Sequence, residues 1–504
     1  MKLKYIVITL ILGLAFTACS KDSDSDSNET AAVTKPDEIN NFVWKAMNSW
    51  YYWQPNVPDL SDSKITSATA YNNFINGKTP DALFYSLLYQ RGTVDRFSWI
   101  ENSNEIVHVS KIAEVEKKGG FSYGIYPKDA SSVNMVALIN YVVPDSPAAL
   151  AGLKRGDVIT KINGSQLTSS NYDQLENPQI TITLAASVEF STSGLVTTDK
   201  TGTLTVTKTE IDENPVAYYE KKVYGEKNIG YLVYNGFKSD YNDELNSAFA
   251  TMKTDGINEL VLDLRYNGGG SVETALALAQ MINGSFTNKP YIYFDFNNKH
   301  NNEDGYENLS EKVKIFNLVD NEPTFEREES VNSLTLKKIY VLVSFQTASA
   351  SELTIQCLKK YISVITIGEE TVGKFVGSNT LYDSPAYNYM SYDNRSTKHK
   401  WQLQPITFSY YNKDKDANPV NIKPDHEINP YSAFLNLVEF GNVKDPSLKK
   451  AIELITGQTL RTTAKNTDLS LPFKIDNLTV FNPTNTAKGL YIEDFQRMKK
   501  QQRN

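Results

Sequence analysis

The sequence has few of the residues that mark metal centres, disulfide-rich scaffolds or nucleic-acid binding. Its 504 residues include only two cysteines and four histidines, and the histidines are scattered without paired spacing. We expect no metal site, because such sites need clustered ligands. The net charge is −8 and no long basic tract occurs, so the concentrated positive charge that binds nucleic acid is missing. Hydrophobic residues make up 40% and charged residues 22%, as in ordinary globular proteins, and the length predicts about three domains.

Long apolar runs are also missing after the N-terminus. Lys2 and Lys4 precede an apolar run from Tyr5 to Ala18 that is too short to span a bilayer. No later run approaches about 20 apolar residues. A basic start followed by a short apolar run is typical of an export signal, so the sequence predicts a signal peptide over residues 1–18.

The end of this run resembles the lipobox of bacterial lipoproteins. Phe16-Thr17-Ala18-Cys19 carries the resemblance, which implies cleavage before Cys19 and a lipid anchor on it; simple secretion is the alternative. Ser20–Glu29 have almost no apolar content, so residues 19–36 are expected to form a solvated acidic tether. The expected location is the outer membrane, on its periplasmic face or at the cell surface. Cys357 lies in an apolar pattern and is expected to be a small buried side chain.

Residues 37–115 carry aromatic and aliphatic side chains at helical spacing. Val43, Met47 and Trp50 would share one face of a helix, which predicts an N-terminal helical domain with an apolar core. An aromatic-binding groove is the alternative interpretation of the same pattern.

Residues 116–208 change to short β segments and glycine turns. Ser146-Pro147 predicts a short helix that Gly152 ends, and Asn163-Gly164 predicts a hairpin turn. The strings SPAALAGL and GDVITKING resemble those of PDZ domains in bacterial proteases. The resemblance implies that the C-terminus of a polypeptide binds by strand addition; an inert β spacer is the alternative. The loop implied to hold the terminal carboxylate is Phe121, Ser122, Tyr123, Gly124 and Ile125.

Residues 215–465 alternate apolar strands with helices. Leu260–Leu264 has the pattern of a buried strand and Val272–Ile282 that of a helix, and this alternation predicts a parallel sheet covered on both faces. A polar stretch at about 284–335 is expected to be an insertion or mobile flap, and residues 466–504 a C-terminal extension. The expected fold class is multidomain α/β, with an N-terminal helical domain, a PDZ-like β module and a βα-alternating core.

Three strings in this core carry residues suited to catalysis. Thr347-Ala-Ser-Ala-Ser-Glu352 follows a strand and opens a helix, whose N–H groups can stabilise an oxyanion, although it is equally an ordinary helix start. The string Gly368–Gly377 holds a lysine between glycines, where burial would favour the neutral amine; a solvated lysine is the alternative. In Leu262–Gly270, glycines between a strand and a helix let backbone N–H groups approach a bound group, without the spacing of nucleotide-binding loops.

Together these strings resemble the carboxy-terminal processing (tail-specific) serine peptidases. The resemblance spans about residues 116–430 and includes Ile422-Lys-Pro-Asp425. It implies a Ser-Lys dyad in which Ser349 is the nucleophile and Lys374 the general base. The backbone N–H groups implied for the oxyanion hole belong to Ala350 and to Gly269 or Gly270.

Two positions depart from the pattern of this family. Many members orient the lysine with an Asp eleven residues after the nucleophile or a Gln four residues after the lysine, and this sequence has Lys360 and Ser378 there. Ser378 could hydrogen-bond the amine. Lys360, if close, would lower the pKa of Lys374 by like-charge repulsion.

The resemblance implies an exported serine endopeptidase that acts on unfolded or C-terminally recognised polypeptides, without a cofactor. The alternative is a non-catalytic lipoprotein that binds peptides or hydrophobic ligands on the same fold. The presence of both Ser349 and Lys374 favours the enzyme, because a binding protein has no use for that pair.

Overall fold

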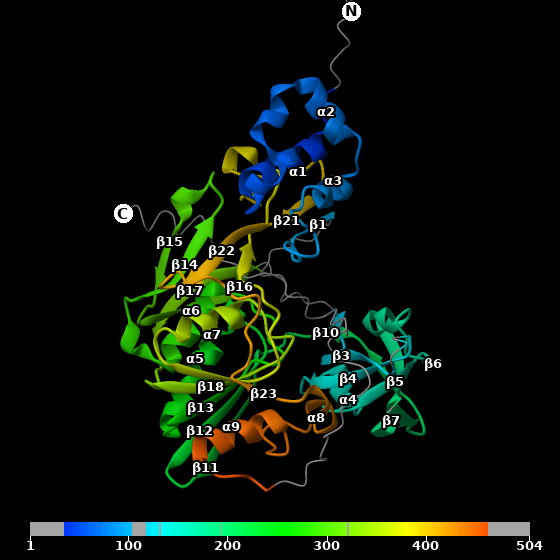
Figure 1. Ribbon diagram of the computed structural model, residues 1–504, viewed down its shortest axis with the longest axis vertical. Helices are drawn as coiled ribbons and strands as arrows, with labels where there is room; N and C mark the ends of the chain where they lie inside the picture. The colour runs from blue at the N-terminus through cyan, green and yellow to red at the C-terminus, as the bar shows by residue number, and fades with distance from the viewer. Residues whose placement is uncertain are drawn as a thin grey trace, which may run out of the picture.

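Three regions follow one another along the described part of the chain. The computed structural model describes residues 35–102, 117–129, 131, 133–191, 193–319 and 322–461. The predicted signal peptide, Cys19 and the stretch after residue 461 lie outside these residues. Figure 1 shows the N-terminal helices at one end of an α/β core and a β-rich module at its side, which confirms the expected fold class. None of the helices among the described residues is long and apolar enough to cross a membrane.

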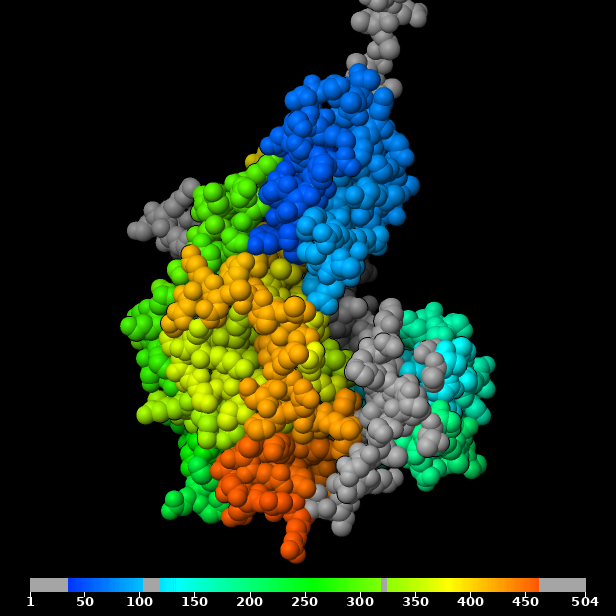
Figure 2. Space-filling view, in the orientation of Figure 1, coloured from blue at the N-terminus to red at the C-terminus, as the bar shows by residue number. Residues whose placement is uncertain are grey.

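The N-terminal region consists of short helices packed on the core. Helix α1 (Glu38–Trp50) begins where Asp37 accepts a hydrogen bond from the N–H of Asn40, and its buried residues include Val43, Met47 and Trp50, as the helical spacing predicted. The elements that follow are η1 (Gln54–Asn56), η2 (Pro58–Leu60), η3 (Asp62–Thr66), α2 (Ala68–Asn76), α3 (Pro80–Ser86) and β1 (Trp99–Asn102). Strand β1 pairs antiparallel with β21 (Trp401–Gln404) of the core. The space-filling view shows this region, in blue, seated directly on the core (Figure 2).

The β-rich module has the turns that its sequence predicts. The Oγ of Ser146 accepts a hydrogen bond from the N–H of Ala149, and Asn163 and Gly164 adopt the positive φ angles of a tight hairpin. Its main sheet has the order β3-β4-β5-β7-β8, with β6 beside β5 and β9 beside β7. The elements are β3 (Phe121–Pro127), β4 (Met135–Val142), α4 (Pro147–Leu150), β5 (Val158–Ile162), β6 (Ser165–Gln166), η5 (Tyr172–Glu176), β7 (Gln179–Ser191), β8 (Gly194–Asp199) and β9 (Leu204–Thr207). A short pair, β2 (Lys117–Lys118) and β10 (Thr209–Glu210), lies where the module begins and ends.

The segment predicted to be a carboxylate-binding loop has a different structure. Phe121, Ser122, Tyr123, Gly124 and Ile125 lie in strand β3 and pair with β4. The prediction of a loop was wrong because aromatic and β-branched residues favour a strand, even next to glycines. Among the described residues β3 pairs only with β4, so it is an edge strand.

The core contains the predicted sheet, covered on both faces. Its order is β11-β12-β13-β18-β19-β23, and every pair after β11-β12 is parallel. Helices α5, α6 and α7 pack on one face, and α9 packs on the other. The strands are β11 (Val216–Tyr224), β12 (Lys227–Tyr234), β13 (Glu259–Asp263), β18 (Lys338–Val343), β19 (Ser363–Gly368) and β23 (His426–Glu427). The helices are η6 (Ser239–Tyr241), α5 (Asn242–Thr254), α6 (Val272–Ile282), α7 (Ala350–Leu358), α8 (Pro430–Leu435) and α9 (Pro446–Thr456).

The polar stretch expected to be an insertion or flap contributes strands to the core. Strand β14 (Pro290–Phe296) lies in a second sheet of order β15-β14-β22-β20, and Ile292, Phe294 and Phe296 are buried at alternate positions along it. The stretch lies between α6 and β18, as an insertion would, but β14 is buried in a sheet and is not a flap; overall polarity concealed its alternation. The other elements are η7 (Gly284–Phe286), η8 (Asn301–Glu303), β15 (Gly305–Asn308), the hairpin β16 (Lys312–Val319) and β17 (Glu322–Ser330), β20 (Val376–Ser378), η9 (Pro385–Tyr387) and β22 (Ile406–Asn412).

Candidate active site

Three loops meet at one edge of the core sheet. They follow β13, β18 and β19, which are neighbours in the sheet and run parallel. The carboxyl ends of parallel strands lie at the same edge, so residues far apart in sequence come together there. The three loops contain Gly269 and Gly270, Ser349 and Lys374 respectively. All three catalytic strings predicted from the sequence thus lie at this edge.

Ser349 lies immediately before helix α7 in a strained backbone conformation. Its φ is 60° and its ψ −115°, a combination that a residue with a Cβ rarely adopts. The residue is fully buried, and its Oγ has no hydrogen-bond partner among the described residues. A buried hydroxyl without a partner costs free energy, and groups of this kind are common at reacting centres.

Lys374 is buried in the loop after β19, with 1% of its surface exposed. Burial lowers the pKa of its amine to about 7, since water no longer stabilises the ammonium. The carboxylates of Glu352 and Asp95 act in the opposite direction, and the Arg96 guanidinium lowers the pKa further. The ring centroid of Phe97 lies 4.8 Å from the Nζ atom. The expectation of a desolvated lysine agrees with this burial.

A carboxylate and a phenol hold Ser349 and Lys374 beside each other. The Oε2 atom of Glu352 accepts hydrogen bonds from the backbone N–H of Ser349 at 2.9 Å and of Lys374 at 2.8 Å. Its Oε1 atom accepts from the N–H of Gly373 at 2.8 Å. The Tyr410 hydroxyl lies 3.0 Å from the carbonyl oxygen of Ser349 and 3.1 Å from that of Lys374. The backbones of Ser349 and Lys374 are therefore held together at their N–H groups by Glu352 and at their carbonyl oxygens by Tyr410.

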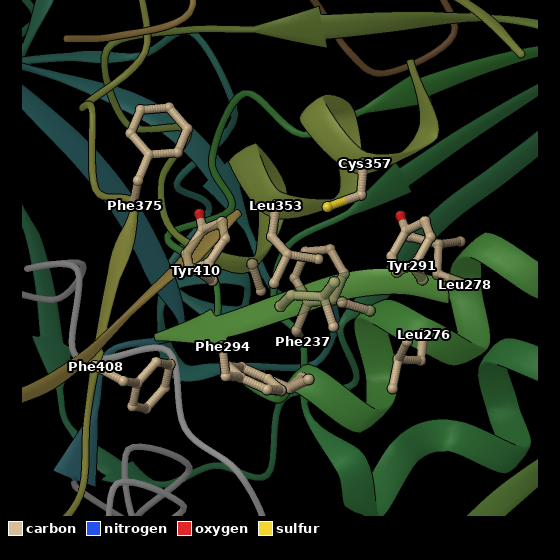
Figure 3. Close-up of a cluster of buried hydrophobic side chains, with 14 of the residues drawn as sticks. Phe237, Leu276, Leu278, Tyr291, Phe294, Leu353, Cys357, Phe375, Phe408 and Tyr410 are labelled. Carbon is tan, nitrogen blue, oxygen red and sulfur yellow. The ribbon is translucent and has the colours of Figure 1, made fainter. Parts of the chain in front are cut away.

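This arrangement rests on a buried hydrophobic cluster. Leu353 of α7 and Tyr410 of β22 lie in it, together with Phe375, which follows Lys374 in the sequence (Figure 3). Close packing of aromatic and aliphatic side chains allows little movement of the backbone above it. The cluster thus supports both of the loops that carry Ser349 and Lys374.

The glycine loop packs directly against Ser349. A Cβ atom added to Gly269 would lie 2.6 Å from the Cβ of Ser349 and 2.8 Å from the nitrogen of Ala350, so only glycine fits there. The N–H of Gly269 donates to the side chain of Asn267 at 2.9 Å. Among the described residues, the N–H groups of Ala350 and Gly270 have no hydrogen-bond acceptor. These two donors are the ones available for an oxyanion.

Lys360 and Ser378, the two positions that depart from the family pattern, each interact with residues other than Lys374. Lys360 is ion-paired with Asp414 at 3.1 Å and with Asp416, and its charge does not lower the pKa of Lys374. Ser378 accepts a hydrogen bond from the Nε2 of Gln404 at 2.9 Å. Lys360 therefore takes no part in making the amine of Lys374 neutral.

Two further expectations concern Cys357 and metal binding. Cys357 is fully buried, as predicted, and burial raises the pKa of its thiol. In the part of the chain that the structure describes, no cluster of three or more His, Cys, Asp or Glu side chains could hold a metal ion.

A buried ionic network links the β-rich module to the glycine loop. Arg265 pairs with Asp263 at 2.6 Å and with Asp445 at 2.9 Å. Arg155, from the turn that precedes β5, lies 3.4 Å from the carboxylate of Asp445, and its Nη1 atom donates to the hydroxyl of Tyr266 at 2.8 Å. Since Tyr266 directly precedes the glycine loop, the module contacts the base of the candidate oxyanion site.

The structure also brings in residues to which the sequence assigned no role. Glu352 follows Ser349 at the spacing of a capping box, which is a signal for its bond to the Ser349 N–H. Nothing in the local sequence indicates Tyr410, because its contacts cross between elements. The same is true of Phe97, which belongs to the N-terminal region and lies against Lys374.

Three family models match the sequence in separate segments. The model of peptidase family S41 matches residues 228–428, and the model of the peptidase S41 N-terminal domain matches residues 38–99. The model of a PDZ domain matches residues 138–176. These segments correspond to the α/β core, the helical region and the β-rich module.

Individual relatives agree with these matches. The protein is 23% identical over 393 residues to a protein of Staphylococcus aureus strain bovine RF122 and 24% identical over 387 residues to one of strain MRSA252; both are named as CtpA-like serine proteases. The alignments cover 72% and 74% of this chain, and 71% and 63% of the two relatives. The crystal structure of an S41-family protein from Bacteroides fragilis matches with a TM-score of 0.62 at 25% identity, covering 82% of this chain and 97% of that one.

Proposed function

We propose that the chain is a serine endopeptidase of peptidase family S41, with a PDZ domain and a dyad of Ser349 and Lys374. One observation carries the assignment: a serine with a buried, unpartnered hydroxyl and a lysine with a desolvated amine both donate their backbone N–H groups to the carboxylate of Glu352. A structural serine would have its hydroxyl satisfied, and a structural lysine would have its amine in water.

The proposed reaction is acyl transfer in two steps. The neutral amine of Lys374 takes the proton of the Ser349 hydroxyl, and the oxygen attacks the carbonyl carbon of a peptide bond. Lys374 then gives that proton to the leaving amine as the C–N bond breaks. Water, deprotonated by the same amine, attacks the ester carbonyl, and the proton returns to Ser349 as the acid product leaves. In both steps the N–H groups of Ala350 and Gly270 would stabilise the oxyanion.

The low pKa of Lys374 matters because only the neutral amine is a base. With the ordinary value of 10.5, about one lysine in three thousand is neutral at pH 7, whereas with a pKa of about 7 roughly half are. Burial thus raises the population of the reactive form about a thousandfold. The Ser349 backbone is already held in the strained conformation that presents its side chain to the glycine loop.

We also propose that the PDZ domain binds unfolded or C-terminal segments of the substrate along β3. The support is that β3 is an edge strand among the described residues, and its outer backbone groups are of the kind that accept an added strand. The strand itself, rather than a loop, would then supply the N–H groups for an extended peptide.

Export and lipid anchoring are proposals that rest on sequence pattern. We propose that residues 1–18 are removed as a signal peptide and that Cys19 is acylated. The protein would then lie at the outer membrane, on the periplasmic face or at the cell surface.

The endopeptidase proposal is tested by digestion of an intrinsically disordered protein, with the products read by mass spectrometry. We expect cleavage by the wild type and none by Ser349→Ala or Lys374→Ala, because the two residues act as one unit. Ser351→Ala is the matched control, since the Oγ of Ser351 already donates to the carbonyl oxygen of Asn267 at 3.0 Å and this variant should still cleave. If wild type and Ser349→Ala bind the substrate equally and neither cleaves it, the non-catalytic binding protein is the correct function.

A further inference from the structure

The segment Asp95–Ser98 of the N-terminal region contacts the loop that carries Lys374. The Nη2 atom of Arg96 donates hydrogen bonds to the carbonyl oxygens of Val372 at 3.1 Å and Gly373 at 3.0 Å. These are the two residues directly before Lys374, and they are 276 and 277 positions from Arg96 in the sequence. The ring of Phe97 covers the amine itself, with its centroid 4.8 Å from the Nζ atom.

Asp95 fixes the conformation of this segment. Its side chain is almost completely buried, and its Oδ1 atom accepts hydrogen bonds from the N–H groups of Phe97 at 3.1 Å and Ser98 at 3.0 Å. Its Oδ2 atom accepts from the hydroxyl of Tyr51, just after α1, at 2.7 Å. Phe97 is thus held in place by a carboxylate that is itself anchored in the helical region.

The other end of the segment is attached to the core. The Oγ of Ser98 accepts a hydrogen bond from the N–H of Ile406 at 2.9 Å, and the next residues form β1, which pairs with β21. Figure 1 shows β1 beside β21, and Figure 2 shows the N-terminal region directly on the core. The segment therefore bridges the two regions at the position of the candidate base.

The charged and titratable groups that face Lys374 come from three elements. Glu352 lies in α7, and Tyr410 of β22 contacts the Lys374 carbonyl oxygen through its neutral hydroxyl. Asp95 and Arg96, both from the N-terminal segment, influence the amine in opposite directions: the carboxylate favours the ammonium, and the guanidinium disfavours it. The face of an aromatic ring also favours a cation.

We propose that Asp95, Arg96 and Phe97 are positioning residues of the active site, through which the N-terminal region holds the Lys374 loop, covers the amine and sets its charge balance. This inference rests on the proposed function, because it assumes that Lys374 is the base. It assigns to the N-terminal region a part in catalysis rather than in stability alone.

The opposite charges of Asp95 and Arg96 make the inference testable. On the acid side of a plot of kcat/KM against pH (the acid limb), the midpoint gives the pKa of the group that the free enzyme must deprotonate, here Lys374. Replacing Arg96 by Gln removes a positive charge and should move the midpoint of this limb to higher pH by about half a unit. Replacing Asp95 by Asn removes a negative charge and should move it to lower pH by a similar amount. A purely structural role would reduce activity in both variants and move neither midpoint.

The experiment measures cleavage of a quenched fluorescent peptide, taken from a site found in the digest above, by the full-length protein over a range of pH. Arg91→Gln is the matched control, because Arg91 stacks on the ring of Tyr85 in the same region at 3.9 Å and should leave the midpoint unchanged. Phe97→Leu is a third variant, which keeps an apolar cover but loses the ring and should lower kcat more than it changes KM. If Asp95→Asn does not fold, Arg96→Gln and Phe97→Leu decide the question.

The outcomes separate the two proposals. A wild type whose cleavage does not depend on Ser349 refutes the proposed function. A Ser349-dependent enzyme in which Arg96→Gln leaves the midpoint of the acid limb unchanged, or moves it to lower pH, refutes the inference and makes the segment an ordinary interface.

Discussion

Replacing Lys374 by Met should make the folded protein more stable while abolishing cleavage. The side chain is buried, and burial lowers its pKa from 10.5 to about 7, which means that the folded state disfavours the ammonium by up to about 5 kcal/mol. Met has a similar length, is apolar and adapts to irregular space. The variant therefore removes the cost of burying a charge without opening a large cavity.

The expected gain in stability depends on pH. The pKa of Lys374 is lower in the folded than in the unfolded state, so between about pH 7 and 10.5 the unfolded protein holds a proton that the folded protein has lost. The stability of the wild type therefore rises with pH across this window, because the unfolded state binds more protons than the folded state there.

 Below about pH 7 both states are protonated and the full cost of burying the ammonium is present, and most of it remains at pH 7. The advantage of Lys374→Met should thus be greatest at neutral and acidic pH and should decline toward pH 10.5.

The measurement is the thermal unfolding midpoint of wild type and variant at a series of pH values. A gain of several kcal/mol should raise the Tm by roughly ten degrees at neutral pH. Lys423→Met is the matched control, because this lysine belongs to the same α/β region but its side chain is 76% exposed. Its replacement should not give a gain in Tm that is large at neutral pH and declines toward pH 10.5. The reasoning is refuted if Lys374→Met is less stable than the wild type at neutral pH, or if the difference in Tm is the same at every pH.

Three other changes test separate parts of the proposal. Gly269→Ala should lower kcat by about a hundredfold or more, because the added Cβ would lie 2.6 Å from the Cβ of Ser349 and displace the oxyanion donors. Gly202→Ala, with positive φ but open space, should leave kcat unchanged, and equal kinetics in both variants would contradict this assignment. Tyr410→Phe should destabilise the protein by about 1–3 kcal/mol and lower kcat, as two buried carbonyl oxygens lose their donor; unchanged Tm and kcat would count against it. Cys19→Ala should move the protein from the membrane to the soluble fraction, and continued membrane association would argue against lipidation.

The part of the site that could be predicted depends on local signals and on the rules of parallel sheets. The loops that carry Gly269, Ser349 and Lys374 each follow an apolar strand, and strands joined by helices lie parallel with their carboxyl ends at one edge. Glycines next to a strand and a serine before a helix are visible in the sequence itself. Their meeting therefore follows from the strand order β13-β18-β19.

The part that could not be predicted depends on contacts without a local pattern. Phe97 reaches Lys374 from an irregular segment, and neither periodicity nor motif spacing indicates which of many aromatic residues would do so. The strands within 284–335 were not predicted, because the polar residues of this stretch concealed the alternation along β14. At Phe121–Ile125 the resemblance to PDZ domains implied a loop, whereas pairing with β4 forms a strand. In each case tertiary packing overrides the local composition.

The costs in free energy are concentrated where the chemistry is proposed. Ser349 has a positive φ and a buried hydroxyl without a partner, and Lys374 is a buried amine; each feature alone destabilises the folded state. They persist because Glu352 binds the N–H groups and Tyr410 the carbonyl oxygens of both residues, and because Asp95 holds the segment that covers the amine. A fold selected for stability alone would replace the lysine by an apolar residue. Many contacts maintain this unfavourable placement of Ser349 and Lys374, which argues that it is kept for the proposed catalysis and not for stability.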